Sequence, residues 1–157
     1  MYVTKCAIAT IAVGEPFTFW AIDHMGPLPE SSRGNKHILV VVDHFTKWCE
    51  AFATPDHEAS TVAPTLISRI FSRFRPPAVL HSDPGPNFES ILMHEICNAM
   101  GITKTRTTAY HPQCNGQTER QNGTLQGMLS SFVSKRIRDD WDWWLDSFTF
   151  ACNKSRN

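Results

Sequence analysis

Several features that would mark a particular class of protein are missing from this sequence. Lys and Arg together number 15, and Asp and Glu also number 15, so the formal net charge is zero. Affinity for nucleic acid comes mainly from neutralised phosphates, so such a partner would require local basic patches or basic segments outside this chain. No apolar run approaches the ~20 residues of a membrane helix, and no clear signal peptide opens the chain. The sequence also shows no internal repeat and no low-complexity tract.

Cysteine is present without the spacings that give it a structural role. The five cysteines are scattered, and no Cys-x-x-Cys pair occurs. Neither a zinc site nor a disulfide framework is therefore supported. We expect reduced thiols, as in a cytosolic or nuclear protein. The five are Cys6, Cys49, Cys97, Cys114 and Cys152.

The composition is that of one ordinary globular domain. The chain has 157 residues, of which 41% are hydrophobic and 19% charged, which is enough to bury a core. We expect residues 1–13 to be a lead-in and residues 14–157 to form the folded domain.

The apolar patterns alternate between strands and helices. Short β-branched and aromatic runs predict strands at 17–22, 37–42, 48–53, 78–81 and 102–107. Helical spacing predicts helices at 60–74, 87–100, 116–134 and 140–152. The order β-β-β-α-β-α-β-α-α predicts the α/β class with a mixed sheet. Asn87 is expected to cap the second helix, with Phe88, Ile91, Leu92, Ile96 and Ala99 on its buried face.

Three acids stand at positions where chemistry is often found. Asp23 and Asp83 each end a predicted strand, and Glu119 opens a helix with 35 residues between it and Asp83. If the two strands are neighbours, their carboxylates project into one crevice. Grouped carboxylates suit Mg²⁺, and a two-ion site clamps the attacking and leaving oxygens of a phosphodiester. A lone Asp at a strand end is more often a turn former, so the surrounding sequence has to decide.

Four motifs supply that context. They are Ile22-Asp23-x-x-Gly26-Pro27-Leu28-Pro29, Val41-Val42-Asp43-x-Phe45-Thr46-Lys47-Trp48-x-Glu50, Ser82-Asp83-x-Gly85-x-Asn87-Phe88 and Tyr110-His111-Pro112-Gln113-x-Asn115-Gly116-Gln117-Thr118-Glu119-Arg120. In this order they resemble retroviral-type integrase catalytic cores of the D,D-35-E family, and most of all the integrases of gypsy-type LTR retrotransposons. The resemblance covers roughly residues 14 to 157.

The resemblance implies a fold, an activity and a set of partners. The fold would be ribonuclease-H-like, a mixed five-stranded sheet flanked by helices. Asp23, Asp83 and Glu119 match the catalytic and metal-binding triad, which would hold Mg²⁺ or Mn²⁺, two ions in number. Tyr110, Asn115 and Asn87 match nucleic-acid-binding positions. The implied reaction is 3′-end processing of element DNA and strand transfer into target DNA, by a homo-oligomer in the nucleus.

Several departures from the family pattern support an alternative. Pro84 and Pro86 flank the second Asp, and Cys114 replaces a usual Ser or Thr. Gln126 stands seven residues after Glu119, where the family favours a cation. The family's zinc domain and DNA-binding region are also not seen, as in an excised or degraded core. The alternative is an impaired or domesticated core that serves as a nucleic-acid-binding or assembly module. A ribonuclease-H-type RNA nuclease is less favoured because it lacks the Tyr-His-Pro-Gln loop.

Other conspicuous residues are given plainer roles. Asp43 is interpreted as structural. His81 and His111 flank two of the acids, but hard oxygen chemistry argues against a zinc site there. The basic residues after 134 are expected to cap the helix C-terminus, and the tryptophans of 140–152 to lie in the core.

Overall fold

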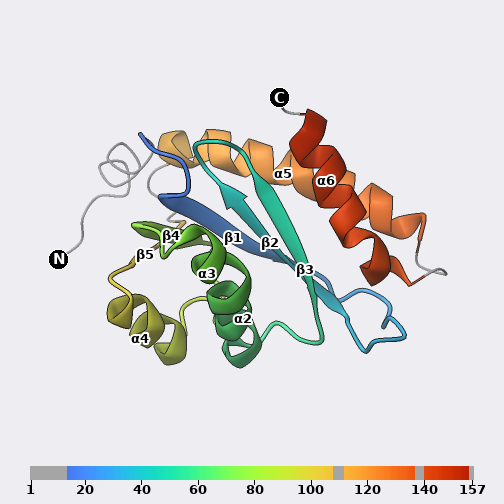
Figure 1. Cartoon of the computed structure of the whole chain (residues 1–157), viewed down its shortest axis with the longest axis horizontal. Coiled ribbons are helices and arrows are strands. Elements are labelled where there is room, and N and C mark those ends of the chain that lie inside the picture. Colours follow the sequence, from blue (N-terminus) through green and yellow to red (C-terminus); the bar gives the residue numbers. More distant parts are fainter. Residues whose placement is uncertain (1–13, 108–111, 137–139, 156–157) are drawn as a thin grey trace.

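The fold is built around one mixed sheet. The computed structural model describes residues 14–107, 112–136 and 140–155, with the backbone alone for 112–122. Its strands are β1 (Phe19–Met25), β2 (His37–Asp43), β3 (Cys49–Thr54), β4 (Val79–Ser82) and β5 (Thr103–Arg106). Across the sheet they run in the order β3-β2-β1-β4-β5 (Figure 1). The predicted mixed sheet of five strands is confirmed.

Strand direction depends on whether a connection contains a helix. Connections without a helix join β1, β2 and β3, which pair antiparallel. The links from β3 to β4 and from β4 to β5 contain helices, and β1–β4 and β4–β5 pair parallel, as crossover connections require. The first strand was expected to end before Asp23, but it continues to Met25. It does so because Asp23, His24 and Met25 pair with β2 opposite Val40, Leu39 and Ile38.

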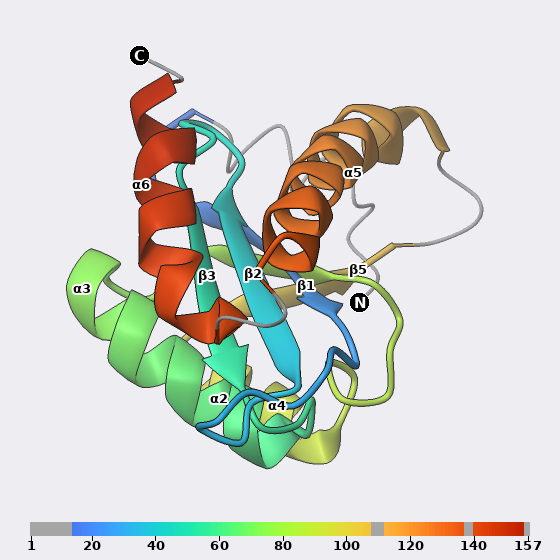
Figure 2. The same cartoon turned by 90° about the vertical axis from the view of Figure 1, so that its right-hand side faces the viewer.

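Helices cover both faces of the sheet. They are α2 (Ala59–Leu66), η1 (Ile67–Phe71), α3 (Ser72–Phe74), α4 (Ile91–Ala99), α5 (Pro112–Ser134), η2 (Trp141–Trp144) and α6 (Leu145–Ser155). Figure 2 shows α2, α3 and α4 on one side of the sheet and α5 and α6 on the other. The single helix predicted at 60–74 is interrupted by η1, a turn of π-helix. It ends at Arg75, whose φ is 71°, before Pro76 and Pro77.

Two apolar cores result, one on each face. In β2, Leu39 and Val41 face the first core, while Ile38, Val40 and Val42 face the second, as the two-residue period of a strand requires. The first core also contains Trp20, Ile22, Phe52, Val62, Ala63, Leu66, Ile70, Phe71, Leu80, Phe88, Met93, Cys97 and Ile102. The second also contains Cys49, Ala51, Leu125, Leu129, Val133, Trp141, Leu145, Phe148 and Cys152.

Helix α4 differs from its prediction in both cap and face. Ser90 is the N-cap, and its hydroxyl accepts a hydrogen bond from the Met93 N–H at 3.2 Å. The later start turns Met93 and Cys97 into the core, while Ile91 is 78% exposed. The predicted end of the helix at residue 100 is confirmed, because Met100 is the C-cap residue. Gly101 follows it with φ 69°, a conformation that glycine adopts without strain.

Helix α5 and the last segment bury only part of their apolar residues. Leu125, Leu129 and Val133 of α5 are buried, but Met128 is 47% exposed. In the last segment Trp141, Leu145 and Phe148 are buried. Trp143 and Trp144 are 63% and 44% exposed, so the expectation that these tryptophans lie in the core is confirmed only for Trp141. Arg136 donates from Nη1 to the Phe132 carbonyl at 3.1 Å, which confirms for this residue the expected cap of the helix C-terminus.

Polar side chains join elements that are distant in sequence. Asp43 is fully buried, and its carboxylate accepts from the N–H groups of Phe17 and Thr46 at 3.1 and 2.9 Å. Its structural role is thereby confirmed. The Asn153 carboxamide of α6 bonds both the N–H and the C=O of Cys49 at 2.9 Å. It thereby pairs the backbone groups of the first residue of β3, which is an edge strand. Within the described residues, Cys97 is a buried free thiol, and no helix is long and apolar enough to span a membrane.

Candidate active site

The register of β1 and β4 places two carboxylates together. Ala21 is the parallel partner of His81, and two further residues along each chain lead to Asp23 and Asp83. Because side chains alternate between faces, both acids belong to the same face as their partners. That face is the one covered by α5, since Asp23 pairs with Val40 of the second core. The expected meeting of the two strand-end acids therefore follows from the sheet itself.

The Asp83 carboxylate influences the pKa of Asp23. The Asp23 side chain is half-buried, and this burial is the main influence that raises its pKa above the usual value. A hydrogen bond from the His24 N–H, 2.8 Å from Oδ1, opposes that rise. The nearby Asp83 carboxylate raises the pKa further, because two like charges disfavour ionisation. A bound cation would relieve this repulsion.

Asp83 is held by a tight turn and remains exposed. Its Oδ1 accepts a hydrogen bond from the Gly85 N–H at 3.0 Å. A Cβ on Gly85 would lie 3.0 Å from that same oxygen and 2.9 Å from Asn87 Oδ1. A side chain at position 85 would therefore have to displace the Asp83 carboxylate or the Asn87 carboxamide. The flanking Pro84 and Pro86 leave the exposed Asp83 side chain open to solvent.

Asn87 contacts the residue that follows the first acid and does not cap a helix. Its Nδ2 is 3.0 Å from Nδ1 of His24, the residue that follows Asp23. The His24 ring stacks on Phe88 with centroids 5.1 Å apart. Asn87 thus links the Asp83 loop to the Asp23 strand. A role in binding nucleic acid stays a prediction.

The remaining predicted site residues fall where side chains are not described. Tyr110 and His111 lie outside the described residues. Glu119 and Asn115 belong to α5 by their backbone, so Asn115 is helical rather than part of the loop before the helix. What the structure establishes for Glu119 is its place on the helix that lies against the Asp23 face of the sheet.

Gln126 is a site residue that sequence reasoning did not assign. It donates a hydrogen bond from Nε2 to Asp23 Oδ2, across 103 positions of sequence. The signal was its spacing of seven residues from Glu119, which places both on one face of an α-helix. The sequence indicates only that Gln126 stands where a cation is expected. The structure shows that Gln126 is a neutral donor in contact with Asp23.

A buried lysine was also missed. Lys104 of β5 has a side chain only 3% exposed, and its ammonium bonds Ser82 Oγ at 2.6 Å and Glu89 Oε1 at 3.2 Å. Burial lowers the pKa of Lys104, and Glu89 opposes that effect. Since Ser82 Oγ bonds the Asp83 carbonyl at 2.8 Å, the pair braces the base of the Asp83 loop. An alternating Thr-Lys-Thr-Arg strand gives no sequence signal for burial.

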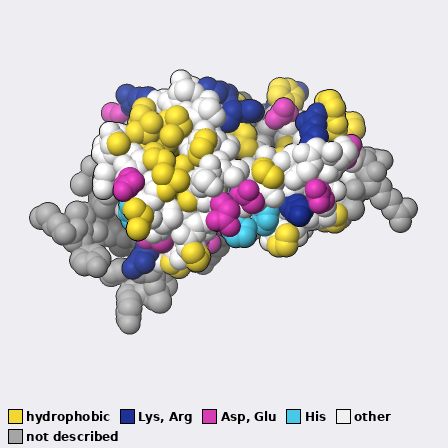
Figure 3. Space-filling view, turned by 90° about the horizontal axis from the view of Figure 1, so that it is seen from below, with side chains coloured by type: hydrophobic (Ala, Val, Ile, Leu, Met, Phe, Trp, Pro, Cys, Tyr) yellow, Lys and Arg dark blue, Asp and Glu magenta, His cyan; other side chains and the backbone are white. Residues whose placement is uncertain are grey.

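A histidine cluster occupies the opposite face of the sheet. The rings of His24, His37 and His57 have centroids 4.8 to 6.3 Å apart, and Asp56 interacts electrostatically with all three. Figure 3 shows acidic and histidine side chains gathered on the face seen from below. Among the residues with described side chains, no three His, Cys, Asp or Glu converge as metal ligands. His81 instead bonds Thr105 and Thr107.

The oxygen donors of the site nevertheless suit a hard divalent ion. Asp23 and Asp83 supply carboxylate oxygens from adjacent strand ends. His24 points to the other face, and the His81 ring on this face bonds the Thr105 and Thr107 hydroxyls. Mg²⁺ is commonly held by one or two protein carboxylates with water completing its shell. The described pair therefore fits such an ion.

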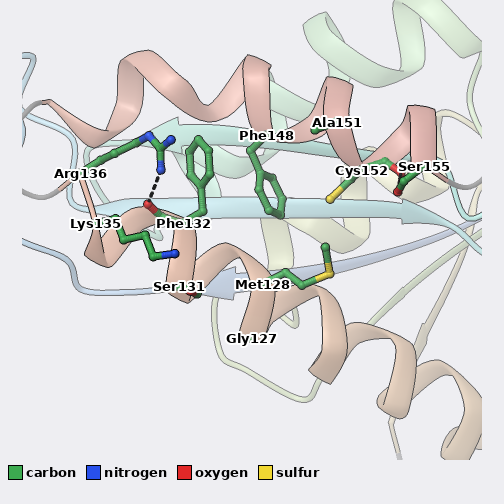
Figure 4. Close-up of a pocket in the computed structure, with 10 residues that line it drawn as sticks. All are labelled: Gly127, Met128, Ser131, Phe132, Lys135, Arg136, Phe148, Ala151, Cys152 and Ser155. Carbon is green, nitrogen blue, oxygen red and sulfur yellow. Dashed lines mark hydrogen bonds between the residues drawn. The ribbon is translucent and has the colours of Figure 1, made fainter.

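A separate groove lies between α5 and α6. It has a volume of about 760 Å³ and is lined by Gly127, Met128, Ser131, Phe132, Lys135, Arg136, Phe148, Ala151, Cys152 and Ser155. Figure 4 shows Phe132 and Phe148 side by side, with Lys135 and Arg136 at one end. The lining contains none of the site carboxylates, so this groove is distinct from the acid pair.

Comparison with known proteins identifies the family. Residues 14–112 match the family model described as integrase core domain. The chain belongs to this family. This integrase core is 37% identical over 126 residues to the Gag-Pol polyprotein of baboon endogenous virus (strain M7) and 38% identical to the Pol polyprotein of radiation murine leukemia virus (strain Kaplan). Both matches cover 80% of this chain but only 7% and 22% of those polyproteins.

A solved structure agrees with the sheet and helices described above. The catalytic core domain of BIV integrase matches with a TM-score of 0.62 and 27% identity, over 83% of this chain and 79% of that one. The ribonuclease-H-like fold expected from the sequence is confirmed. The retroviral-type integrase core is likewise confirmed, while the closer likeness to gypsy-type elements and the D,D-35-E spacing remain predictions.

Proposed function

We propose that this integrase core catalyses polynucleotidyl transfer, namely 3′-end processing of retroelement DNA and strand transfer into target DNA. The observation that carries the proposal is the placement of Asp23 and Asp83 on one face at the ends of adjacent parallel strands. Family membership makes this reaction class the natural use of such a pair. The substrate and the individual steps belong to the proposal.

Asp23, Asp83 and Glu119 would together hold Mg²⁺ or Mn²⁺, two ions in number. When bound, the ions would activate the attacking oxygen and stabilise the leaving oxygen. Asp23 is oriented for this task by the His24 N–H, and the exposed Asp83 can reach a substrate phosphate. Tyr110, Asn115 and Asn87 would contact the DNA. Neither step requires a covalent intermediate with the protein.

The partners and the setting follow the same proposal. DNA is the partner, as element ends and as target, and the active form is a homo-oligomer acting in the nucleus. Residues 14–157 form the catalytic core domain, and residues 1–13 are a lead-in. With a net charge of zero, DNA affinity depends on local basic patches or on further basic segments.

The test measures cleavage and joining of labelled donor DNA ends in Mn²⁺ and in Mg²⁺. We expect Asp23→Asn, Asp83→Asn and Glu119→Gln each to lower activity by at least about 100-fold, since removing one member of a unit disables it. Glu95→Gln is the matched control, because Glu95 is an exposed acid on α4. Activity that persists in Glu119→Gln would overturn the assignment of that residue.

A second function is favoured by one observation. Gln126 places a neutral donor on the helix face that Glu119 shares, where a cation would bind phosphate. An impaired core could keep its fold and serve as a nucleic-acid-binding or assembly module. Such a module would bind donor DNA with an affinity that Mg²⁺ leaves unchanged, and it would show no turnover. Divalent-dependent nicking by the wild-type chain would exclude it.

A further inference from the structure

The carboxylate of Asp23 is held by one donor on each oxygen. Oδ1 accepts from the His24 N–H at 2.8 Å, and Oδ2 accepts from the Gln126 side chain. An ionised carboxylate accepts hydrogen bonds and donates none, so the Gln126 amide nitrogen must face it. Each oxygen has two lone pairs, and one on each oxygen is left for another ligand. Two donors in fixed directions set the plane of the carboxylate and leave lone pairs of both oxygens available to a ligand.

The two donors come from different parts of the fold. The His24 N–H belongs to β1 itself and moves with Asp23. Gln126 belongs to α5, which is anchored by its neighbours Leu125 and Leu129, 1% and 0% exposed in the second core. The Gln126 bond therefore ties the helix that carries Glu119 to the strand that carries Asp23. One helix turn is 5.4 Å, so Glu119 lies about 10 Å along the axis on the same face.

The neutrality of Gln126 matters as much as its hydrogen bond. A lysine or arginine at this position would pair with Asp23 and oppose a divalent cation arriving at the same oxygens. A carboxamide offers a comparable donor without a positive charge. The Asp23–Asp83 pair thus keeps its full negative charge while Asp23 is held in orientation. Ligating carboxylates are typically hydrogen-bonded in this manner, and loss of the partner costs metal affinity.

We propose that Gln126 is a positioning residue for Asp23, which orients the carboxylate for a divalent ion and fixes the approach of α5 to it. The inference rests on the proposed metal role of Asp23 and Asp83. It assigns a function to the position where a cation was expected. Gln126 acts through Asp23 rather than on the substrate.

The main test is Mn²⁺ binding by isothermal titration calorimetry, with no DNA present. Gln126→Met keeps the length of the side chain and removes the donor. We expect it to weaken Mn²⁺ binding about 10-fold or more and to raise the pKa of Asp23 in an NMR titration of the carboxyl carbon. Gln126→Lys restores a donor and adds a charge, so it should lower the Asp23 pKa again without restoring Mn²⁺ affinity.

The matched control is Asn153→Leu, which removes another helix carboxamide that anchors a strand. It should lower the stability of the fold, while Mn²⁺ affinity and the Asp23 pKa stay at wild-type values. A merely structural role for Gln126 would make Gln126→Met behave as this control does. That result would overturn the inference.

Asp23→Asn separates failure of the inference from failure of the proposed function. If this variant abolishes Mn²⁺ binding while Gln126→Met binds as tightly as the wild type, the metal site stands and the role of Gln126 fails. If the wild type binds no Mn²⁺, or Asp23→Asn leaves binding unchanged, the proposed metal site fails and the inference falls with it.

Discussion

His24 follows Asp23 directly and turns its ring to the other face of the sheet. Its pKa is lowered to about 4, first by burial and then by the neighbouring His37 and His57, while Asp56 opposes the shift. Its Nε2 is buried without a hydrogen-bond partner. A proton on this ring would have to be accommodated beside two other histidines. The folded state therefore stabilises the neutral form of the His24 ring.

This lowered pKa predicts a loss of stability in mild acid. The unfolded chain takes up the proton near pH 6.5, whereas the folded chain takes it up near pH 4. The stability is present above pH 6.5 and is lost as the pH falls through this window, by about 3 kcal/mol in all. His24→Asn keeps an acceptor for Asn87 and removes the titration. Urea unfolding at several pH values should show a flatter profile for this variant.

Two comparisons isolate the contribution of His24. His94→Gln, at an exposed histidine of α4 outside the cluster, serves as the control for removing a histidine. Asp23 acts in the opposite direction, because its raised pKa favours folding as pH falls. The readout is therefore the difference between variant and wild type. Equal slopes for His24→Asn and wild type would contradict the prediction.

At the scale of the element, α5 contains two glycines that packing does not require. A Cβ at Gly123 or at Gly127 would meet nothing within 4 Å, and neither residue has a positive φ. Glycine inside a helix costs about 1 kcal/mol relative to alanine. The helix that carries Glu119 and Gln126 is thus weaker than its burial alone would allow.

Gly123→Ala should raise the free energy of unfolding by about 0.5–1 kcal/mol in urea titrations. Gly101→Ala is the matched control, because a Cβ there also meets nothing within 4 Å, but φ is 69°. Alanine is strained in that conformation, so the control should destabilise the protein. Two substitutions with equal space around them are expected to have opposite signs. Destabilisation by Gly123→Ala would contradict the prediction and would mean that α5 requires glycine at this position.

Helices also show how far the sequence could be interpreted. The Ile-Leu-Val run of β2 predicts a strand covered on both faces, and both faces are indeed covered. The face of α4 was wrong because Phe88 packs into the core just before the helix begins. Counting Phe88 as the first helical residue misplaced Ile91 and Leu92, which are exposed, whereas Ile96 does pack against the first core. Ser90 caps the helix in place of Asn87 because the Asn87 side chain is hydrogen-bonded to His24, a tertiary contact that local sequence does not reveal.

The candidate site was predictable in part for a related reason. Strand ends and sequence motifs locate Asp23 and Asp83, and the parallel pairing of β1 with β4 explains their proximity. Gln126 and Lys104 could not be assigned because each gains its role from a contact more than 20 positions away. Polar residues at helical or strand spacing indicate solvent exposure unless such a partner is known.

On the scale of the whole molecule, the two apolar cores share one sheet. Alternate residues of β2 belong to different cores, so neither core can lose its packing while the sheet remains intact. Leu66→Ala in the first core and Leu129→Ala in the second should each cost about 3 kcal/mol. Both variants should unfold in one transition when followed by circular dichroism and by tryptophan fluorescence.

Leu92→Ala provides the comparison, because Leu92 is 39% exposed on α4. Its cost should stay below about 1 kcal/mol. Noncoincident transitions in either core variant would mean that the two layers fold independently.

The π turn of η1 has a consequence for how this region varies in length. A π turn closes its hydrogen-bonded ring with one residue more than an α turn. The surplus residue is absorbed inside Ile67–Phe71, so that Leu66 before it and Ile70 and Phe71 within it all remain buried. Deletion of the exposed Ser68 would convert the segment to continuous α-helix and leave both flanking pieces on the sheet. Related sequences aligned over this segment should therefore show a one-residue gap. Such a gap would record an insertion that the π turn absorbed while the two ends of the helix kept their positions.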